Sequence, residues 1–287
     1  PRRFGKSLTL SMLENYYDIN KKDDFETIFG GLYIGKNPTP EHNTYLVIHL
    51  NFAEVDSGLD DYKEGLDTHC RLVFEDFCTR YAALLPQGTK EEMKSEQGAI
   101  AQLRFLCQKC AEVKQKIYLF IDEYDNFTNM ILSSEEHLER YKGQTHGEGY
   151  LRRFFNTIKG AANTSLGRIF VTGVSPVTMD DLTSGFNIGT NYSLKPRFNE
   201  MTGFTEEEVR DMLSYYAGVL PFNHTVDELI EIMKPWFDNY CFAINSYGKT
   251  TMYNSIMVLN FVDNYIENDC NIPDKMVEPN IRIDYSK

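Results

Sequence analysis

The segment KIYLFIDEYDN, residues 116–126, contains five consecutive apolar residues that end abruptly in acids. The run from Ile117 to Ile121 has the length of one strand and no polar face, which is typical of a strand buried in a parallel sheet. Asp122 and Glu123 follow at its carboxyl end, the edge at which open parallel sheets bind their ligands. We therefore predict a buried strand that carries two carboxylates at this edge.

Two further apolar runs predict strands of the same kind. TYLVIHLNF (44–52) precedes the acidic strand in the sequence, and GRIFVTGVSPV (167–177) follows it. In the latter segment we predict a strand from Arg168 to Thr172. The spacing of apolar residues between these runs predicts helices at residues 58–83, 91–114 and 149–163. Because strands alternate with helices, we expect a parallel sheet flanked by helices.

After about residue 200, the spacing of apolar residues predicts mainly helices. GFTEEEVRDMLSYYAG (203–218) opens with a capping box, in which Thr205 is followed three residues later by Glu208. Further helices are predicted at residues 225–235 and 252–268, with a small hairpin or irregular segment between them. Its aromatic residues either line a pocket or, as the spacing favours, form the core of this part: Trp236, Phe237, Tyr240 and Phe242.

The N-terminal stretch PRRFGKSLTL, residues 1–10, contains Gly5-Lys6-Ser7 directly before a helical pattern. A phosphate-binding loop, G-x-x-x-x-G-K-[ST], needs a further glycine five positions before Gly5, which lies outside this sequence. In such a loop the backbone N–H groups and the positive helix end hold the phosphates. The lysine contacts the β- and γ-phosphates, and the serine hydroxyl binds Mg²⁺. A Gly-Lys-Ser can also be an ordinary helix start, so this assignment needs a partner elsewhere in the chain.

The acids at the end of the strand supply that partner. Asp122 can support Mg²⁺ directly or through water, and Glu123 can polarise the attacking water. Thr172 or Ser175 would lie near the γ-phosphate if its strand stands between the loop strand and the acidic strand. Each signal also has a simpler explanation. The two acids can end a strand in solvent, and Thr172 can be a turn residue whose hydrogen bonds are made within the protein. Together and in this order, they predict a site for ATP and Mg²⁺.

We therefore predict an α/β fold: a P-loop NTPase parallel sheet flanked by helices, followed by a smaller, mainly helical lid subdomain. The first part covers residues 1–198 and lacks its first strand, since the sequence begins inside the loop. The second covers residues 199–287 and ends in a linker-like tail that is rich in proline and aspartate.

Five segments, PRRFGKSLTLSML, LFIDEYDN, VTGVSPV, FNEMTGFTEEEV and EPNIRIDYSK, together resemble the AAA-ATPase-like family of anaerobes such as Bacteroides. In that family the first glycine of the loop is commonly absent, so the spacer PRRF follows the family's own pattern. The resemblance implies that Lys6 and Ser7 serve phosphate and Mg²⁺ (Walker A) and that Asp122 and Glu123 form the acidic pair (Walker B). Asp125 belongs to the same motif, or only caps the segment that follows. The resemblance also implies a nuclease-like domain that follows this ATPase module in the family.

The candidate site contains further residues around these. Arg197, in LKPRFNEMTGF, precedes the helical part and is a candidate sensor or arginine finger, with a surface ion pair as the alternative. We count it with Glu123 and Thr172 as catalytic candidates. We expect the nucleotide to be bound by Arg3, Phe4, Gly5, Lys6, Ser7 and Leu8.

The composition limits the partners of the chain. Its formal net charge of −13 opposes binding to the phosphate backbone of nucleic acids. No apolar run approaches the roughly 18–20 residues of a membrane span. Cys107 and Cys110 form a C-x-x-C pair in a helical pattern without a second pair at zinc spacing. We read them as reduced, partly buried thiols and expect a cytoplasmic protein.

The function that these features favour is Mg-dependent ATP binding and hydrolysis, coupled to a protein partner or to a C-terminal effector domain. The alternative is a non-catalytic switch that binds the nucleotide without turning it over. Direct processing of nucleic acid is disfavoured by the acidic charge. A measurement of turnover beside one of binding separates the first two functions.

Overall fold

Two compact units make up the chain. The computed structural model describes residues 3–55, 62–125, 149–174, 189–246 and 248–277. Leu10–Gly189 form one unit, here named the sheet unit, and Pro1–Thr9 together with Thr190–Lys287 form the other, here named the helical unit. The sequence predicts a division between residues 198 and 199. The observed grouping differs chiefly in assigning the first nine residues to the helical unit, because Phe4 is buried there.

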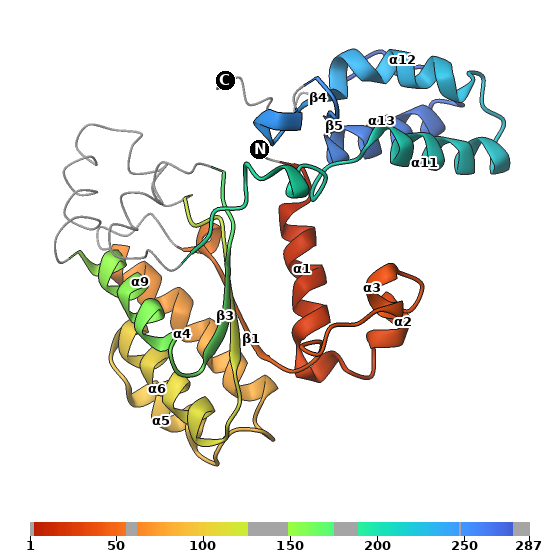
Figure 1. Cartoon of the computed structure of the whole chain (residues 1–287). Coiled ribbons are helices and arrows are strands. Elements are labelled where there is room, and N and C mark those ends of the chain that lie inside the picture. The colour runs from red at the N-terminus through yellow and green to blue at the C-terminus, as the bar shows by residue number, and fades with distance from the viewer. Residues whose placement is uncertain (1–2, 56–61, 126–148, 175–188, 247, 278–287) are drawn as a thin grey trace. The chain divides into compact units, whose positions relative to one another are not determined.

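A three-stranded parallel sheet forms the centre of the sheet unit (Figure 1). Its order is β1–β2–β3, with β2 in the middle and every residue of β2 buried. The strands are β1 (Leu46–Asn51), β2 (Ile117–Asp122) and β3 (Leu166–Val171). Each strand lies within or beside an apolar run from which it was predicted. The predicted α/β class with helices around a parallel sheet is confirmed.

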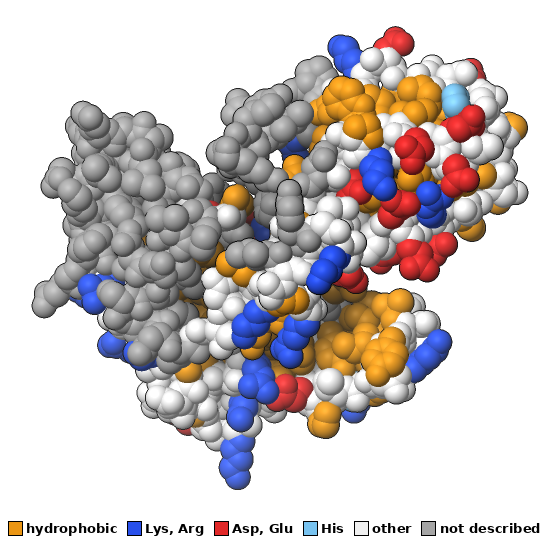
Figure 2. Space-filling model, turned by 45° about the horizontal axis from the view of Figure 1, so that its top comes forward, with side chains coloured by type: hydrophobic (Ala, Val, Ile, Leu, Met, Phe, Trp, Pro, Cys, Tyr) orange, Lys and Arg blue, Asp and Glu red, His pale blue; other side chains and the backbone are white. Residues whose placement is uncertain are grey.

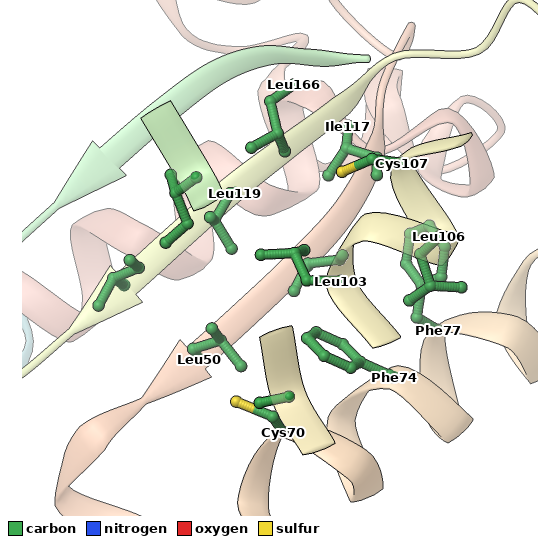
Figure 3. Close-up of a cluster of buried hydrophobic side chains, with 14 of the residues drawn as sticks. Leu50, Cys70, Phe74, Phe77, Leu103, Leu106, Cys107, Ile117, Leu119 and Leu166 are labelled. Carbon is green, nitrogen blue, oxygen red and sulfur yellow. The ribbon is translucent and has the colours of Figure 1, made fainter. Parts of the chain in front are cut away.

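In the part of the chain that the structure describes, four helices form a layer over one face of this sheet. They are α4 (Tyr62–Arg80), α5 (Thr89–Ser95), α6 (Gly98–Glu112) and α9 (Tyr150–Ala161). The odd-numbered residues of β2, such as Leu119, point into the core beneath them. Figure 3 shows Phe74 of α4 and Leu103 of α6 reaching toward Leu50 and Leu119 of the sheet. Burial of this apolar surface fixes the odd-numbered face of β2 against the helices.

Helix α1 (Lys6–Tyr17) covers the opposite face from Leu10 onward. Leu10 is fully buried in a cluster with Tyr118 and Phe120, which are the even-numbered neighbours on β2. After α1 the chain forms a 3₁₀ turn (Ile19–Lys21) and the short helices α2 (Phe25–Phe29) and α3 (Tyr33–Lys36). These short helices were not predicted, because four or five residues are too few to establish a helical period.

The helix predicted at 91–114 is in fact two helices. Glu96 and Gln97 are extended, and α6 begins at Gly98, which has φ +82°. The Asp67 carboxylate accepts a hydrogen bond from the Ala99 N–H group at 2.7 Å. A Cβ at residue 98 would lie 3.1 Å from that carboxylate. The helical pattern therefore breaks where the Ala99 N–H group, which has no carbonyl partner within α6, bonds to Asp67 of α4 instead. The periodicity of the sequence does not reveal such a long-range contact.

Asp67 joins three helices of the sheet unit. Besides the α6 N-terminus, it accepts a hydrogen bond from the Tyr150 hydroxyl at the start of α9, and Lys63 pairs with it at 3.2 Å. Asp67→Ala should lower the free energy of unfolding by about 2 kcal/mol, because buried donors lose their acceptor. Urea denaturation measures this change.

A matched control lies on the same helix. Asp76 pairs with Arg80 one turn away and is 62% exposed. Asp76→Ala should cost less than about 0.5 kcal/mol, since exposed ion pairs contribute little. Equal losses in the two variants would contradict the role assigned to Asp67.

The described residues of the helical unit form three longer helices and a two-stranded antiparallel ribbon. The elements are α11 (Glu206–Val219), α12 (Val226–Phe237), β4 (Asp238–Tyr240), β5 (Met252–Tyr253) and α13 (Ser255–Glu267), with 3₁₀ turns at Pro196–Phe198 and Ile244–Ser246. The capping box of Thr205 and Glu208 is confirmed. A second box, Thr225 with Glu228, starts α12 and escaped prediction although the same pattern was present.

Acidic and basic side chains lie together on the surface of the helical unit (Figure 2). Glu206 pairs with Arg210 at 3.0 Å and with Lys234 at 2.9 Å, which joins α11 to α12. These groups are more than one-third exposed, so the pairs stabilise the unit only slightly. Among the described residues, no helix is long and apolar enough to cross a membrane.

The aromatic group predicted as core divides into three environments. Phe237 is fully buried in the core of the helical unit, as expected. Trp236 is 54% exposed, which contradicts the expectation, because α12 turns this side chain away from the core. Tyr240 and Phe242 contact Phe4 instead. The predicted linker-like tail is in part packed against the helical unit. Ile272, Met276 and Val277 contact its core, and residues 278–287 lie outside the described part.

Candidate functional site

Asp122 ends the central strand on the face that α1 covers. Side chains alternate along a strand, and Tyr118 and Phe120 pack with Leu10 of α1, so Asp122 continues their row. Its side chain is only 2% exposed. Asn51 at the end of β1 is its partner in the parallel register. A buried carboxylate at the carboxyl edge of a parallel sheet is poised to bind a cation or a hydrogen-bond donor.

Glu123 has an unusual backbone conformation. Its φ is +51°, in the left-handed region that non-glycine residues seldom adopt. The Glu123 N–H group donates to Asp122 Oδ1 at 2.9 Å. Backbone strain of this kind costs of order 1–3 kcal/mol and concentrates at functional sites. The turn directs the chain away from the strand, so the two acids differ in surroundings: Asp122 is buried and Glu123 is half-buried.

Thr172 lies beside the acidic end of β2. Its N–H group donates to the Ile121 carbonyl at 2.8 Å, and its own carbonyl accepts from Tyr124 at 3.2 Å. Phe170, two residues earlier, packs on the α1 side of the sheet, and alternation places Thr172 in the same row. The structure thus brings Asp122 and Thr172 to one edge and one face. Ser175, the alternative to Thr172 at the γ-phosphate, lies outside the described residues.

Asp125 closes the turn that follows β3. It is fully buried, and the Val174 N–H group donates to both of its carboxylate oxygens at 3.0 Å. Gly173 lies so close that a Cβ there would be 2.5 Å from the Tyr124 ring and would overlap the Asp125 carboxylate. Asp125 therefore holds the turn after β3 through the Val174 amide, whereas the segment that it was predicted to cap lies outside the described residues. The close approach of Gly173 was missed, although a glycine directly after a strand is its signal.

This contact yields a stability prediction. Gly173→Ala should destabilise the sheet unit by about 2 kcal/mol, because a methyl group enters filled space between rigid neighbours. Gly160→Ala, on α9 with nothing within 4 Å of its added Cβ, is the control and should be neutral or stabilising by about 0.5–1 kcal/mol. Thermal unfolding of both variants tests this, and parent-like stability of Gly173→Ala would contradict it.

Helix α1 runs antiparallel to β1 on this face. The Tyr45 N–H group, at the start of β1, donates to the Tyr17 carbonyl at 3.0 Å. Near the end of the strand, His49 Nδ1 lies 2.5 Å from the carboxylate of Glu14, which is earlier in the helix. Followed from Tyr17 back to Leu10, α1 therefore runs toward the carboxyl ends of the strands. Burial lowers the pKa of His49, but the contact with Glu14 outweighs this and raises it overall.

The Gly-Lys-Ser sequence stands at the start of α1. Gly5 has φ +86°, and its carbonyl accepts from the Thr9 N–H group at 2.9 Å, so the helix begins directly at Lys6. First-turn N–H groups and the helix dipole together favour an anion at such an end. Ser7 and Leu8 are exposed at this turn. The predicted helix start after the loop is confirmed.

Phe4 and Arg3 differ in what they can offer a ligand. The Phe4 side chain is 1% exposed and is packed inside the helical unit, so only its backbone can face a nucleotide. Arg3 is half-buried and has φ +69°. Arg2 lies outside the described residues. The expected contact of Phe4 with the nucleotide stays a prediction.

Comparison with known families identifies the chain. The model of a family described as AAA-ATPase_like, Predicted AAA-ATPase, matches residues 1–183. The chain belongs to the AAA-ATPase-like family. Neither the curated proteins nor the solved structures contain a match to it. The matched range includes Lys6, Ser7, Asp122, Glu123 and Thr172.

Arg197 lies beyond the range matched by the AAA-ATPase-like model. It belongs to the 3₁₀ turn Pro196–Phe198 of the helical unit and is exposed. Its guanidinium carbon lies 4.6 Å from the centroid of the Phe198 ring and 5.8 Å from that of Tyr192. These contacts are of the cation–π kind. The sensor or finger role of Arg197 stays a prediction.

The two thiols of the C-x-x-C pair are buried in this AAA-ATPase-like chain. All six cysteines are free, and Cys107 and Cys110 are both buried on α6. Burial raises the pKa of the Cys107 thiol to about 11 and raises that of Cys110 further, so neither is a thiolate near neutral pH. Among the described residues, no group of three or more His, Cys, Asp or Glu side chains could hold a metal ion.

Proposed function

We propose that this AAA-ATPase-like chain binds ATP with Mg²⁺ and hydrolyses it. The observation that carries the proposal is the acidic end of β2, where buried Asp122 is followed by the strained Glu123 and flanked by Thr172. Membership of a family described as Predicted AAA-ATPase supports it independently. The Gly-Lys-Ser sequence at the start of α1 supplies the phosphate-binding chemistry.

In this proposal the start of α1 binds the phosphates. The backbone N–H groups of the first turn and the Lys6 ammonium group hold the β- and γ-phosphates. Arg3, Gly5 and Leu8 border the same turn. The Ser7 hydroxyl and the Asp122 carboxylate are hard oxygen ligands of the kind that Mg²⁺ prefers, so the residues fit this ion. Bound Mg²⁺ would neutralise negative charge on the phosphate oxygens.

The other residues serve the attacking water and the transferred phosphoryl group. Glu123 accepts a proton from the water or orients it, which a carboxylate at this edge can do without being a metal ligand. Thr172 offers a hydroxyl to the γ-phosphate. Arg197 is the candidate cation for the charge that develops in the transition state. These roles rest on chemistry and on the order of the elements along the chain.

We further propose that nucleotide state is transmitted to a protein partner or to a nuclease-like effector domain, as the family resemblance implies. Nucleic-acid binding by this chain itself is disfavoured by its charge of −13. The six free, largely buried cysteines suit a reducing compartment, and we place the protein in the cytoplasm.

Two measurements on the same protein test the function. Calorimetric titration with ATP and Mg²⁺ should show saturable binding at one site per chain. Phosphate release should then exceed one equivalent per chain many times over. Binding without turnover would support the switch and reject hydrolysis. Absence of binding would overturn both functions.

A further inference from the structure

The ring of Phe4 occupies an aromatic socket in the helical unit. Its centroid lies 4.5 Å from that of Tyr240 and 5.1 Å from that of Phe242, and both pairs are edge-to-face. Such pairs are favourable beyond the area they bury. Phe4 directly precedes Gly5, the residue from which α1 starts. The side chain of this loop residue is therefore held by aromatic contacts within the helical unit.

Gly203 completes the socket through its backbone. Its N–H group donates to the Phe4 carbonyl at 3.0 Å. Its φ is +92°, and an added Cβ would lie 2.9 Å from both the Phe4 ring and the Tyr253 carbonyl. The position therefore requires glycine for its backbone conformation and for the close approach of Phe4.

Asn199 fixes the segment that carries Phe242. It is 2% exposed, and its Oδ1 accepts hydrogen bonds from the Phe242 and Ala243 N–H groups, both at 3.0 Å. Asn199 and Gly203 belong to the segment FNEMTGF (198–204), to which the proposed function assigns no residue of the ATP site. Both residues belong to the socket instead. Asn199 fixes the position of Phe242, and Gly203 donates its N–H group to the Phe4 carbonyl.

We propose that the Phe4 socket, formed by Tyr240, Phe242 and Gly203, positions the phosphate loop for nucleotide binding. Phe4 is a positioning residue: it holds the backbone that enters Gly5 and α1, so less conformational entropy is lost when the phosphates bind. The proposal rests on the proposed function. By linkage, a nucleotide that binds the ordered loop also stabilises the helical unit that orders it.

Truncation of the anchor tests this role. Phe4→Ala should weaken ATP binding about tenfold, because part of the binding free energy must then be used to order the loop. Phe4→Leu, which keeps most of the apolar volume, should stay within about threefold of the parent. The control is Phe222→Ala, since Phe222 packs edge-to-face on Tyr265 elsewhere in the helical unit, with ring centroids 5.0 Å apart. It should lower the melting temperature without changing ATP affinity.

Two readouts show whether each variant is folded and whether the socket is intact. The single tryptophan, Trp236, lies on α12 and reports unfolding of the helical unit by fluorescence. Hydrogen exchange at the Gly203 amide reports its bond to the Phe4 carbonyl without any nucleotide. This amide should exchange faster in Phe4→Ala and as in the parent in Phe222→Ala.

The outcomes separate this proposal from the proposed function. A parent that binds no ATP would remove the proposed function and with it the positioning role, whatever the exchange data show. A folded Phe4→Ala with exposed Gly203 amide and parental ATP affinity would overturn the positioning role alone. If Phe4→Ala does not fold, the Phe4→Leu variant decides between the outcomes. Faster exchange of the Gly203 amide together with unchanged ATP affinity contradicts the proposal. Exchange and ATP affinity that both match the unmutated chain support it.

Discussion

Lys6→Ala should weaken ATP binding by about a hundredfold, or about 3 kcal/mol, because a phosphate loses a charge-assisted partner that water replaces poorly. Lys6 is the first residue of α1, where its charge adds to the favourable helix dipole. Alanine is a good helix former, so the helix itself should persist. Calorimetric titration of the variant with ATP and Mg²⁺ measures the loss.

The control for Lys6 is another lysine of the chain. Lys22 is exposed beside the 3₁₀ turn that follows α1. Lys22→Ala removes the same charge from the protein and should leave ATP affinity within about twofold of the parent, because screening weakens charges at a distance. If both variants lost affinity alike, the effect would be one of net charge and not of the loop.

Glu123→Gln should retain ATP binding and slow phosphate release by at least about a hundredfold, because the amide cannot accept the proton of the attacking water. Glutamine matches glutamate in size, so the left-handed backbone at φ +51° carries about the same strain in both. The measurement is steady-state phosphate release at saturating ATP, with binding determined separately. Parental turnover would exclude Glu123 as the group that activates water.

Two further variants separate chemistry from conformation at this residue. Glu112→Gln changes an exposed acid at the end of α6 and should leave turnover unchanged. Glu123→Gly relieves the left-handed strain and should be as stable as the parent or more so, yet equally slow. Such a result would show that the strain is retained for function and not for folding.

Much of the sheet unit could be predicted because its signals are local. Five apolar residues from Ile117 to Ile121 suffice to indicate a buried strand, and the acids that follow them mark its carboxyl end. The capping box at Thr205 likewise lies within four residues of sequence. The break before Gly98 was missed because its cause, Asp67, is on another helix.

The candidate site was predicted only as far as residue types and their order. The sequence indicated Asp122 and Thr172 at strand ends, but not that they share one face beside each other. That follows from the parallel pairing of β2 with β3 and from α1 packing on the even-numbered residues. Likewise, nothing near Phe4 in the sequence indicated that its ring is buried against Tyr240 and Phe242.

The sequence by itself determined the α/β class, the strand order along the chain and the chemistry available at Lys6, Ser7, Asp122 and Glu123. Each of these depends on side-chain type and on spacing within a few residues. Only the tertiary structure decided the left-handed turn at Glu123, the hydrogen bonds from the Val174 N–H group to Asp125 and the socket around Phe4. These features depend on close packing between residues far apart in the chain, and periodicity carries no information about which distant surfaces will meet.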